Sequence, residues 1–366
     1  MCFVNKIIFC EDLMRIFLQS SGKRRFLTDI HKHSLQHIIY FYHICYMDQG
    51  ENIKSLIHGV NHRDRRALAK AITLIESNRP EDQEIKSMLM KAARSLGKAA
   101  VKVGITGSPG VGKSTFLNGF VRMFGESSSR IAILTIDPSS TLTGGSILGD
   151  KLRMTDIADM EQVFIRPSPS KGTLGGINLT TWETVLLCEA AGYDYIFIET
   201  VGVGQSEIEI QYLVNEVWYL TMARAGDEIQ GIKRGILEIV DRVIVTKEDL
   251  NPREAQNTAA FLRQSLKIIQ TRPKKASFYT LTPLQQDTMK TLFEDLQTVQ
   301  PHPLEKDQLT FWFSRGWRET ILRKIQSHPR IQVLYERMLS DVHGNASDYW
   351  SAMDHLVNEI DDLWKE

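Results

Sequence analysis

A glycine-rich loop between an apolar strand and a helical run constrains the fold of this chain more than any other feature. Residues 101–106 form the apolar run, and a helical pattern starts at Phe116. Between them the chain reads Gly107-Ser108-Pro109-Gly110-Val111-Gly112-Lys113-Ser114-Thr115, which matches the phosphate-loop pattern at every required position. The sequence therefore predicts an α/β fold of the P-loop NTPase type, a mostly parallel sheet with helices on both faces.

The chemistry of this loop assigns a role to each of its parts. Its backbone N–H groups, from Gly107 to Thr115, are expected to surround phosphate oxygens, because glycines let the chain turn them inward. Lys113 is expected to neutralise charge on the β- and γ-phosphates, and the Ser114 hydroxyl to bind Mg²⁺.

Composition excludes several other classes of protein. The 366 residues are 42% apolar, which suffices for a sizeable core, and the 44 basic residues are balanced by 44 acidic ones. No excess positive charge draws the chain to nucleic acid or to an anionic membrane, so neither is an expected partner. The four cysteines have no metal-ligand or disulfide spacing, which favours a cytoplasmic protein.

The chain is expected to divide into four regions. Residues 1–46 differ in composition from the rest and have two open interpretations: a dispensable extension or start-site artefact, with Met47 as an alternative initiator, or a docking arm. Residues 47–98 show helical spacing with a break near Asn78-Arg79-Pro80 and predict a helical cap. The nucleotide domain is expected over 99–287, and C-terminal helices over 288–366.

Acidic residues follow two further predicted strands. The strand 131–136 ends at Asp137, and the strand 193–198 leads to Glu199, with Gly202 three residues later. The carboxyl ends of parallel strands meet at one edge of the sheet, where ligands bind. We therefore expect Asp137 and Glu199 to join Ser114 around Mg²⁺, and the Gly202 N–H to contact the γ-phosphate.

A fourth predicted strand, 242–245, leads to a possible base-reading motif. Thr246-Lys247-Glu248-Asp249 follows it directly. The Asp249 carboxylate is suited to accept from the N1 and N2 donors of guanine, which adenine lacks, and the Lys247 stem to lie along the ring. The nucleotide is therefore predicted to be GTP or GDP.

Glycine-rich stretches lie on either side of the third predicted strand. Residues 144–154 and 202–209 are interpreted as switch segments that order around a γ-phosphate, with ordinary loops as the alternative.

Together these motifs resemble the methylmalonyl-CoA mutase-associated GTPase family, among the metallochaperone-type P-loop GTPases. Further segments carry the resemblance: Leu68–Glu76, Asp137–Ser140, Gly144–Met154, Pro167–Gly172, Glu199–Glu207, Gly226–Lys233 and His328-Pro329. The chain departs from the family where Ala223-Arg224 replaces Pro-Gly and where Thr246 replaces Asn. In addition, Thr282-Pro283-Leu284 stands where a Ser-Ala segment normally contacts the base. Pro283 has no N–H to donate, so reduced base affinity is expected.

The resemblance implies a function beyond nucleotide binding. Members of the family bind a cobalamin-dependent acyl-CoA mutase, and their GTP cycle gates loading of adenosylcobalamin and protection of the enzyme. Relatives have also been described as kinases of a lysine/arginine/ornithine transport system, and the family's C-terminal helices form a homodimer. Two alternatives stay open at this point, a nickel-insertion metallochaperone GTPase and a phosphotransferase.

Overall fold

The computed structural model divides into two compact units, Met1–Gly59 and Val60–Glu366, and every labelled helix and strand belongs to the second. It describes residues 53–77, 79, 81–125, 127–137, 154–169, 177–200, 206–222, 234–269, 275–282 and 285–363.

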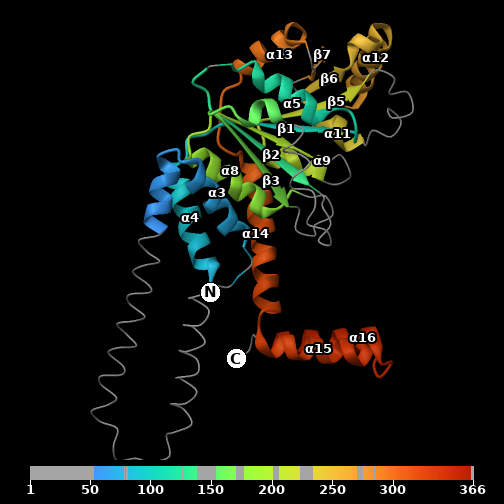
Figure 1. Ribbon diagram of the computed structural model, residues 1–366. Coiled ribbons are helices and arrows are strands. Elements are labelled where there is room, and N and C mark those ends of the chain that lie inside the picture. The colour runs from blue at the N-terminus through green and yellow to red at the C-terminus, as the bar shows by residue number, and fades with distance from the viewer. Residues whose placement is uncertain are drawn as a thin grey trace, which may run out of the picture. The chain divides into compact units, whose positions relative to one another are not determined.

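A seven-stranded parallel sheet forms the centre of the second unit (Figure 1). The strand order is β3-β2-β4-β1-β5-β6-β7. The strands are β1 Val101–Gly107, β2 Ile131–Asp137, β3 Val163–Pro169, β4 Tyr195–Glu199, β5 Glu216–Met222, β6 Arg242–Thr246 and β7 Ser277–Thr280. The predicted parallel α/β fold is confirmed, and β1 occupies the middle of the sheet because it pairs with both β4 and β5.

Helices cover both faces of this sheet. One face packs against α5 (Lys113–Arg122), α7 (Thr155–Ala158) and α13 (Gln286–Gln297). The other face carries α8 (Leu179–Ala190), α9 (Ser206–Glu209), the 3₁₀ turn η1 (Ile210–Tyr212), α11 (Arg234–Ile239) and α12 (Pro252–Ile269). A further 3₁₀ turn, η2 (Glu248–Leu250), follows β6.

Aromatic rings fill the core under α5. Phe120 is fully buried and packs edge-on against Phe197, Trp218 and Phe293, with centroids 5.4–6.0 Å apart. Burying a ring of this size stabilises the fold by about 1.5–3 kcal/mol. This packing holds α5, and therefore the loop before it, in place on the sheet.

Two helices on the N-terminal side pack against α8. These are α3 (Arg65–Glu76) and α4 (Asp82–Leu96), and the break between them lies where the sequence predicts it. Asp64 caps α3 by accepting from the Arg66 backbone N–H at 2.8 Å. Residues 53–61 are also helical, so the apolar pattern before Asp64 belongs to a separate helix.

The C-terminal helices are α14 (Lys306–Gln326), α15 (Pro329–His343) and α16 (Tyr349–Leu363). Trp312 of α14 is fully buried and stacks on Trp182 of α8, with centroids 5.6 Å apart. Of the residues that the structure describes, none belongs to a helix long and apolar enough to cross a membrane.

Candidate nucleotide-binding site

The glycine-rich loop leaves the end of β1 and enters α5. Gly107 has φ +150°, and a Cβ there would lie 2.2 Å from the Leu220 carbonyl oxygen of β5. Only glycine allows the two strands to approach this closely. Gly112 caps α5 in the left-handed region, with φ +94°, and in the described part of the chain no side chain caps this helix. Its first N–H groups therefore suit phosphate oxygens.

Lys113 is buried beside this loop, with only 7% of its surface exposed. Its Nζ donates to the carbonyl oxygens of Gly107 at 2.7 Å and Ser108 at 3.2 Å. Burial lowers the pKa of the Lys113 ammonium below its usual value, while the carboxylates of Glu199 and Glu207 oppose that decrease. A triphosphate brings negative charge to the ammonium and favours its charged form.

The magnesium ligands expected from the sequence come from the first turn of α5 and from the ends of two neighbouring strands. Ser114 Oγ donates to Glu199 Oε1 at 2.8 Å. Glu199 ends β4, where it is in register with Ile105 of β1, so the sheet fixes this contact. A hydroxyl and a carboxylate this close fit Mg²⁺, which takes few protein ligands and completes its shell with water and phosphate oxygens. The backbone of Asp137 ends the adjacent strand β2, and its side chain lies outside the described part of the structure.

Thr246 joins the base-reading end of the site to the phosphate loop. The Thr246 hydroxyl is fully buried and lies 3.3 Å from the carbonyl oxygen of Val111 and 3.2 Å from that of Thr221. An unpaired buried hydroxyl costs about 1–3 kcal/mol, so this contact stabilises the junction of β6 with the loop. The threonine that departs from the family pattern therefore has a hydrogen-bonding role in this structure.

Asp249 and Thr282 form a hydrogen bond at the base-reading end of the site. Thr282 Oγ1 donates to Asp249 Oδ1 at 3.1 Å, and the Thr282 N–H donates to Thr288 Oγ1 at 3.0 Å. These bonds orient the Asp249 carboxylate, which is solvent-exposed and so accessible to a base. Lys247 has φ +59°, and its Nζ lies 3.8 Å from Met222 Sδ.

Several predicted site residues lie outside the described part of the structure. These are Gly202, Pro283, Leu284, the departure at Ala223-Arg224, and residues 144–153 and 202–205 of the two switch segments. The remaining predicted residues, from Gly107 to Thr115 with Glu199, Thr246, Lys247, Asp249 and Thr282, lie at the carboxyl edge of the sheet, at or directly after the ends of β1, β4, β6 and β7.

Two residues near the site have roles that the sequence did not assign to them individually. Glu207 of α9 is buried, and its carboxylate opposes the decrease in the pKa of Lys113. Ile210 of η1 packs on Gly104 of β1, where a Cβ would lie 2.4 Å from Ile210 Cδ1. A glycine inside a strand often marks a place where another part of the chain packs closely, so Gly104 is the feature of the sequence that indicates this contact.

Comparisons with known proteins agree with this geometry. The family described as "Methylmalonyl Co-A mutase-associated GTPase MeaB" matches residues 68–305. A probable GTPase of Mycobacterium tuberculosis is 40% identical over 297 residues, which cover 77% of this chain and 87% of the relative. The mitochondrial methylmalonic aciduria type A homolog of Mus musculus is 35% identical over 328 residues, which cover 83% of this chain and 79% of the relative.

Among solved structures, one described as an LAO/AO transport system kinase superposes with a TM-score of 0.58 at 26% sequence identity. The superposition covers 85% of this chain and 98% of that one.

Proposed function

Because this chain belongs to the methylmalonyl-CoA mutase-associated GTPase family, we propose that it is a GTP-dependent chaperone of a cobalamin-dependent acyl-CoA mutase. In this proposal its GTP cycle gates the loading of adenosylcobalamin and protects the mutase. The observation that carries the proposal is the family match over residues 68–305, which spans the whole nucleotide site. Relatives named for methylmalonic aciduria type A, 34–35% identical, support the mutase as partner.

The chain is a GTPase, and the site suggests how its residues act on GTP. Lys113 would stabilise charge that develops on the β- and γ-phosphates, and the N–H of Gly202 would contact the γ-phosphate. Ser114 and Glu199, with Asp137, would hold Mg²⁺. A bound Mg²⁺ at these residues would supply positive charge that offsets the negative charge of the phosphates. Asp249, oriented by Thr282, would select guanine.

We propose a homodimer formed by the C-terminal helices. Large apolar side chains are exposed there, among them Phe313 (75%), Trp317 (61%) and Trp350 (76%). Phe313 and Trp317 are four positions apart and so share one face of α14, and a contiguous exposed apolar surface is typical of an association site. Sedimentation of the wild type should give a dimer and Trp317→Arg a monomer with intact GTP binding; a wild-type monomer would contradict the proposal.

Affinity capture of the purified protein's partners from a native lysate of the source organism tests the chaperone proposal. We expect an acyl-CoA mutase, identified by mass spectrometry, in an amount that differs between GDP and a non-hydrolysable GTP analogue. A hydrogenase or urease subunit in its place would support nickel insertion instead. Transfer of label from γ-labelled GTP to a protein or amino acid, rather than to free phosphate, would support the phosphotransferase alternative.

A further inference from the structure

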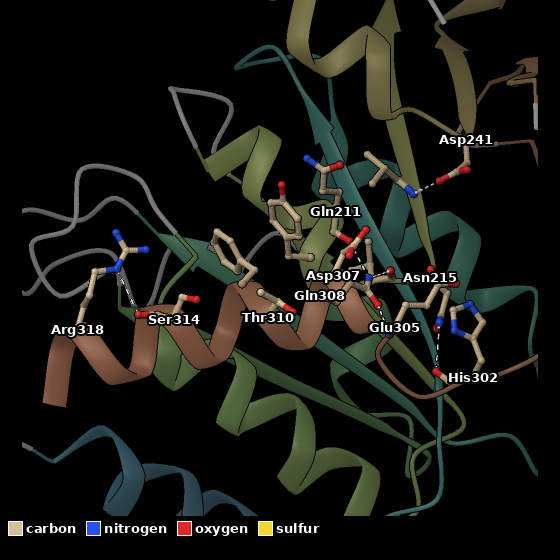
Figure 2. A pocket seen from close by; sticks show the side chains of 14 residues that line it. Gln211, Asn215, Asp241, His302, Glu305, Asp307, Gln308, Thr310, Ser314 and Arg318 are labelled. Carbon is tan, nitrogen blue, oxygen red and sulfur yellow. Dashed lines mark hydrogen bonds between the residues drawn. The ribbon is translucent and has the colours of Figure 1, made fainter. Parts of the chain in front are cut away.

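Side chains of α14 supply the hydrogen-bond donors for the end of η1. The last carbonyl groups of a helical segment have no partner within it. Gln308 Nε2 donates to the carbonyl oxygens of Gln211 at 2.7 Å and Val214 at 2.9 Å, and Trp312 Nε1 donates to that of Tyr212 at 2.8 Å. Figure 2 shows Gln211 beside Gln308, above the helix that carries Thr310 and Ser314.

An ion pair and a ring stack strengthen the same contact. Arg315 Nη1 lies 2.8 Å from Glu209 Oε2 of α9, and both side chains are largely buried. The rings of Tyr212 and Phe311 stack with centroids 4.2 Å apart and planes 8° from parallel. Residues 308, 311, 312 and 315 share one face of α14 because they are three or four positions apart. Two turns of α14 therefore follow α9 and η1 closely.

The segment α9–η1 also packs against β1, the strand that leads into the phosphate loop. Ile210 of η1 packs on Gly104 of β1, three residues before the phosphate loop. The 2.4 Å that a Cβ at Gly104 would leave to Ile210 shows that β1 and η1 have no space between them. A shift of β1 on nucleotide binding would therefore displace η1.

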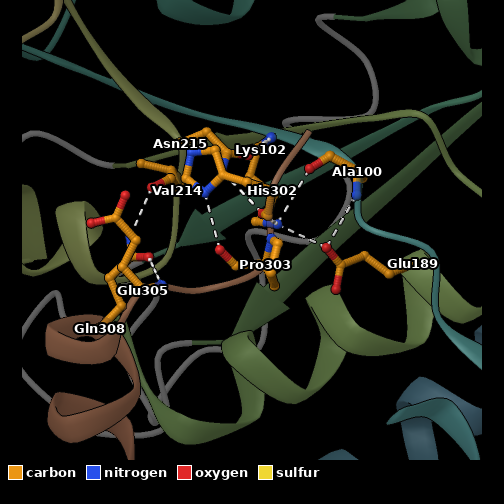
Figure 3. Close-up of polar contacts among 9 residues, drawn as sticks. All are labelled: Ala100, Lys102, Glu189, Val214, Asn215, His302, Pro303, Glu305 and Gln308. Carbon is orange, nitrogen blue, oxygen red and sulfur yellow. Dashed lines mark hydrogen bonds and ion pairs between the residues drawn. The ribbon is translucent and has the colours of Figure 1, made fainter. Parts of the chain in front are cut away.

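The chain just before α14 is fixed to the central strand by a buried lysine (Figure 3). Lys102 Nζ donates to the carbonyl oxygen of His302 at 3.2 Å and pairs with Glu189 Oε1 at 2.8 Å. Asn215 Nδ2 donates to the same His302 carbonyl at 3.3 Å. One end of α14 is thus held on β1 while its next two turns follow η1, so a displacement of η1 would tilt the helix.

We propose that α9–η1 couples the nucleotide site to α14, so that the seating of α14 differs between the GDP and GTP states. This coupling would give the C-terminal helices a nucleotide-dependent position. Its use in signalling the nucleotide state to a mutase rests on the proposed function. Coupling is reciprocal, so a partner bound to α14 would change the relative affinities for GTP and GDP.

Hydrogen exchange of the full-length protein tests this coupling without any partner. Peptides covering residues 306–316 should differ in protection between GDP and a non-hydrolysable GTP analogue, each with Mg²⁺. Arg315→Gln, which removes the ion pair with Glu209, should reduce that difference, and Glu209→Gln should reduce it to a similar extent. Arg318→Gln is the matched control, because Arg318 is exposed and, among the residues that the structure describes, donates only to the Ser314 carbonyl of its own helix, at 3.2 Å. It should retain the difference.

Equal protection of residues 306–316 in the two states of the wild type would overturn the coupling. So would a difference that is as large in both Arg315→Gln and Glu209→Gln as in the wild type. Protection is compared between the two nucleotide states of the same variant. A substitution that lowers the protection of α14 equally in both states therefore leaves the difference unchanged. The exchange experiment contains no mutase, so a negative result would contradict the coupling and not the chaperone proposal. Failure to capture a mutase would contradict the chaperone proposal and not the coupling.

Discussion

Replacing Gly107 by alanine should separate β1 from β5 at the start of the phosphate loop. The new Cβ would lie 2.2 Å from the Leu220 carbonyl oxygen, a distance at which backbone must move. Gly107 also has φ +150°, which L side chains rarely adopt. Gly112→Ala is the matched control, because φ is +94° there but the nearest atom, Thr115 Cβ, is 4.0 Å away.

Comparing the two variants separates two contributions to the loss of unfolding free energy, backbone strain and overpacking. Backbone strain at a positive φ costs about 1–3 kcal/mol, and both variants bear it. Overpacking against a neighbouring strand adds about 1–3 kcal/mol, and only Gly107→Ala bears that. We therefore expect Gly107→Ala to lose about 1–3 kcal/mol more free energy of unfolding than Gly112→Ala.

Urea unfolding of the nucleotide-free proteins, followed by circular dichroism, measures this difference. Repeating it with saturating GDP should stabilise wild type by mass action and Gly107→Ala much less, because the displaced loop binds phosphate poorly. If Gly107→Ala were as stable as Gly112→Ala, the close approach of the two strands would be refuted.

Three further changes probe other parts of the molecule. Lys113→Ala should lower GTP turnover, measured as phosphate release, about 100-fold or more, since it removes a charge that stabilises the transition state; wild-type turnover would exclude that role. Asp249→Asn should weaken GTP binding about 5- to 150-fold, as expected for 1–3 kcal/mol, and strengthen binding of xanthosine triphosphate, both measured by calorimetry; unchanged GTP affinity would remove Asp249 as the base reader. Burial raises the pKa of Tyr193 to about 12 from its usual 10.0. The folded protein therefore keeps this tyrosine neutral where the unfolded chain ionises it, and stability falls as pH rises from 10 to 12. Tyr193→Phe should remove about 2 kcal/mol of that fall, and an unchanged pH profile would contradict the burial argument.

The phosphate loop and its flanking strand and helix could be predicted because all their signals are local. Three strands were not predicted, for physical reasons. β3 is an edge strand that carries Pro167 and Pro169, residues that a sheet tolerates at its edge but that read as a loop in sequence. β7 is a four-residue edge strand. β5 begins with Glu216, whose burial depends on an ion pair with Arg242 at 2.6 Å.

The contacts that organise the site could not be predicted from spacing. The Thr246 hydroxyl meets the carbonyl of Val111 across 135 positions, and Gln308 meets that of Gln211 across 97. In each contact the acceptor is a backbone carbonyl. Because every residue has one, the residue types in the sequence do not indicate which carbonyl the side chain contacts. The identity of Asp249 as a base reader could be predicted, whereas its orientation by Thr282 required the fold.

The kinetics of adenosylcobalamin loading test the chaperone account most directly. Purified acyl-CoA mutase from the source organism would be mixed with adenosylcobalamin, and cofactor binding followed by absorbance, with and without this protein. The account predicts that the loading rate in its presence differs between GTP and GDP, and that Lys113→Ala removes the difference. Loading at one rate with GTP, with GDP and without the protein would contradict the account.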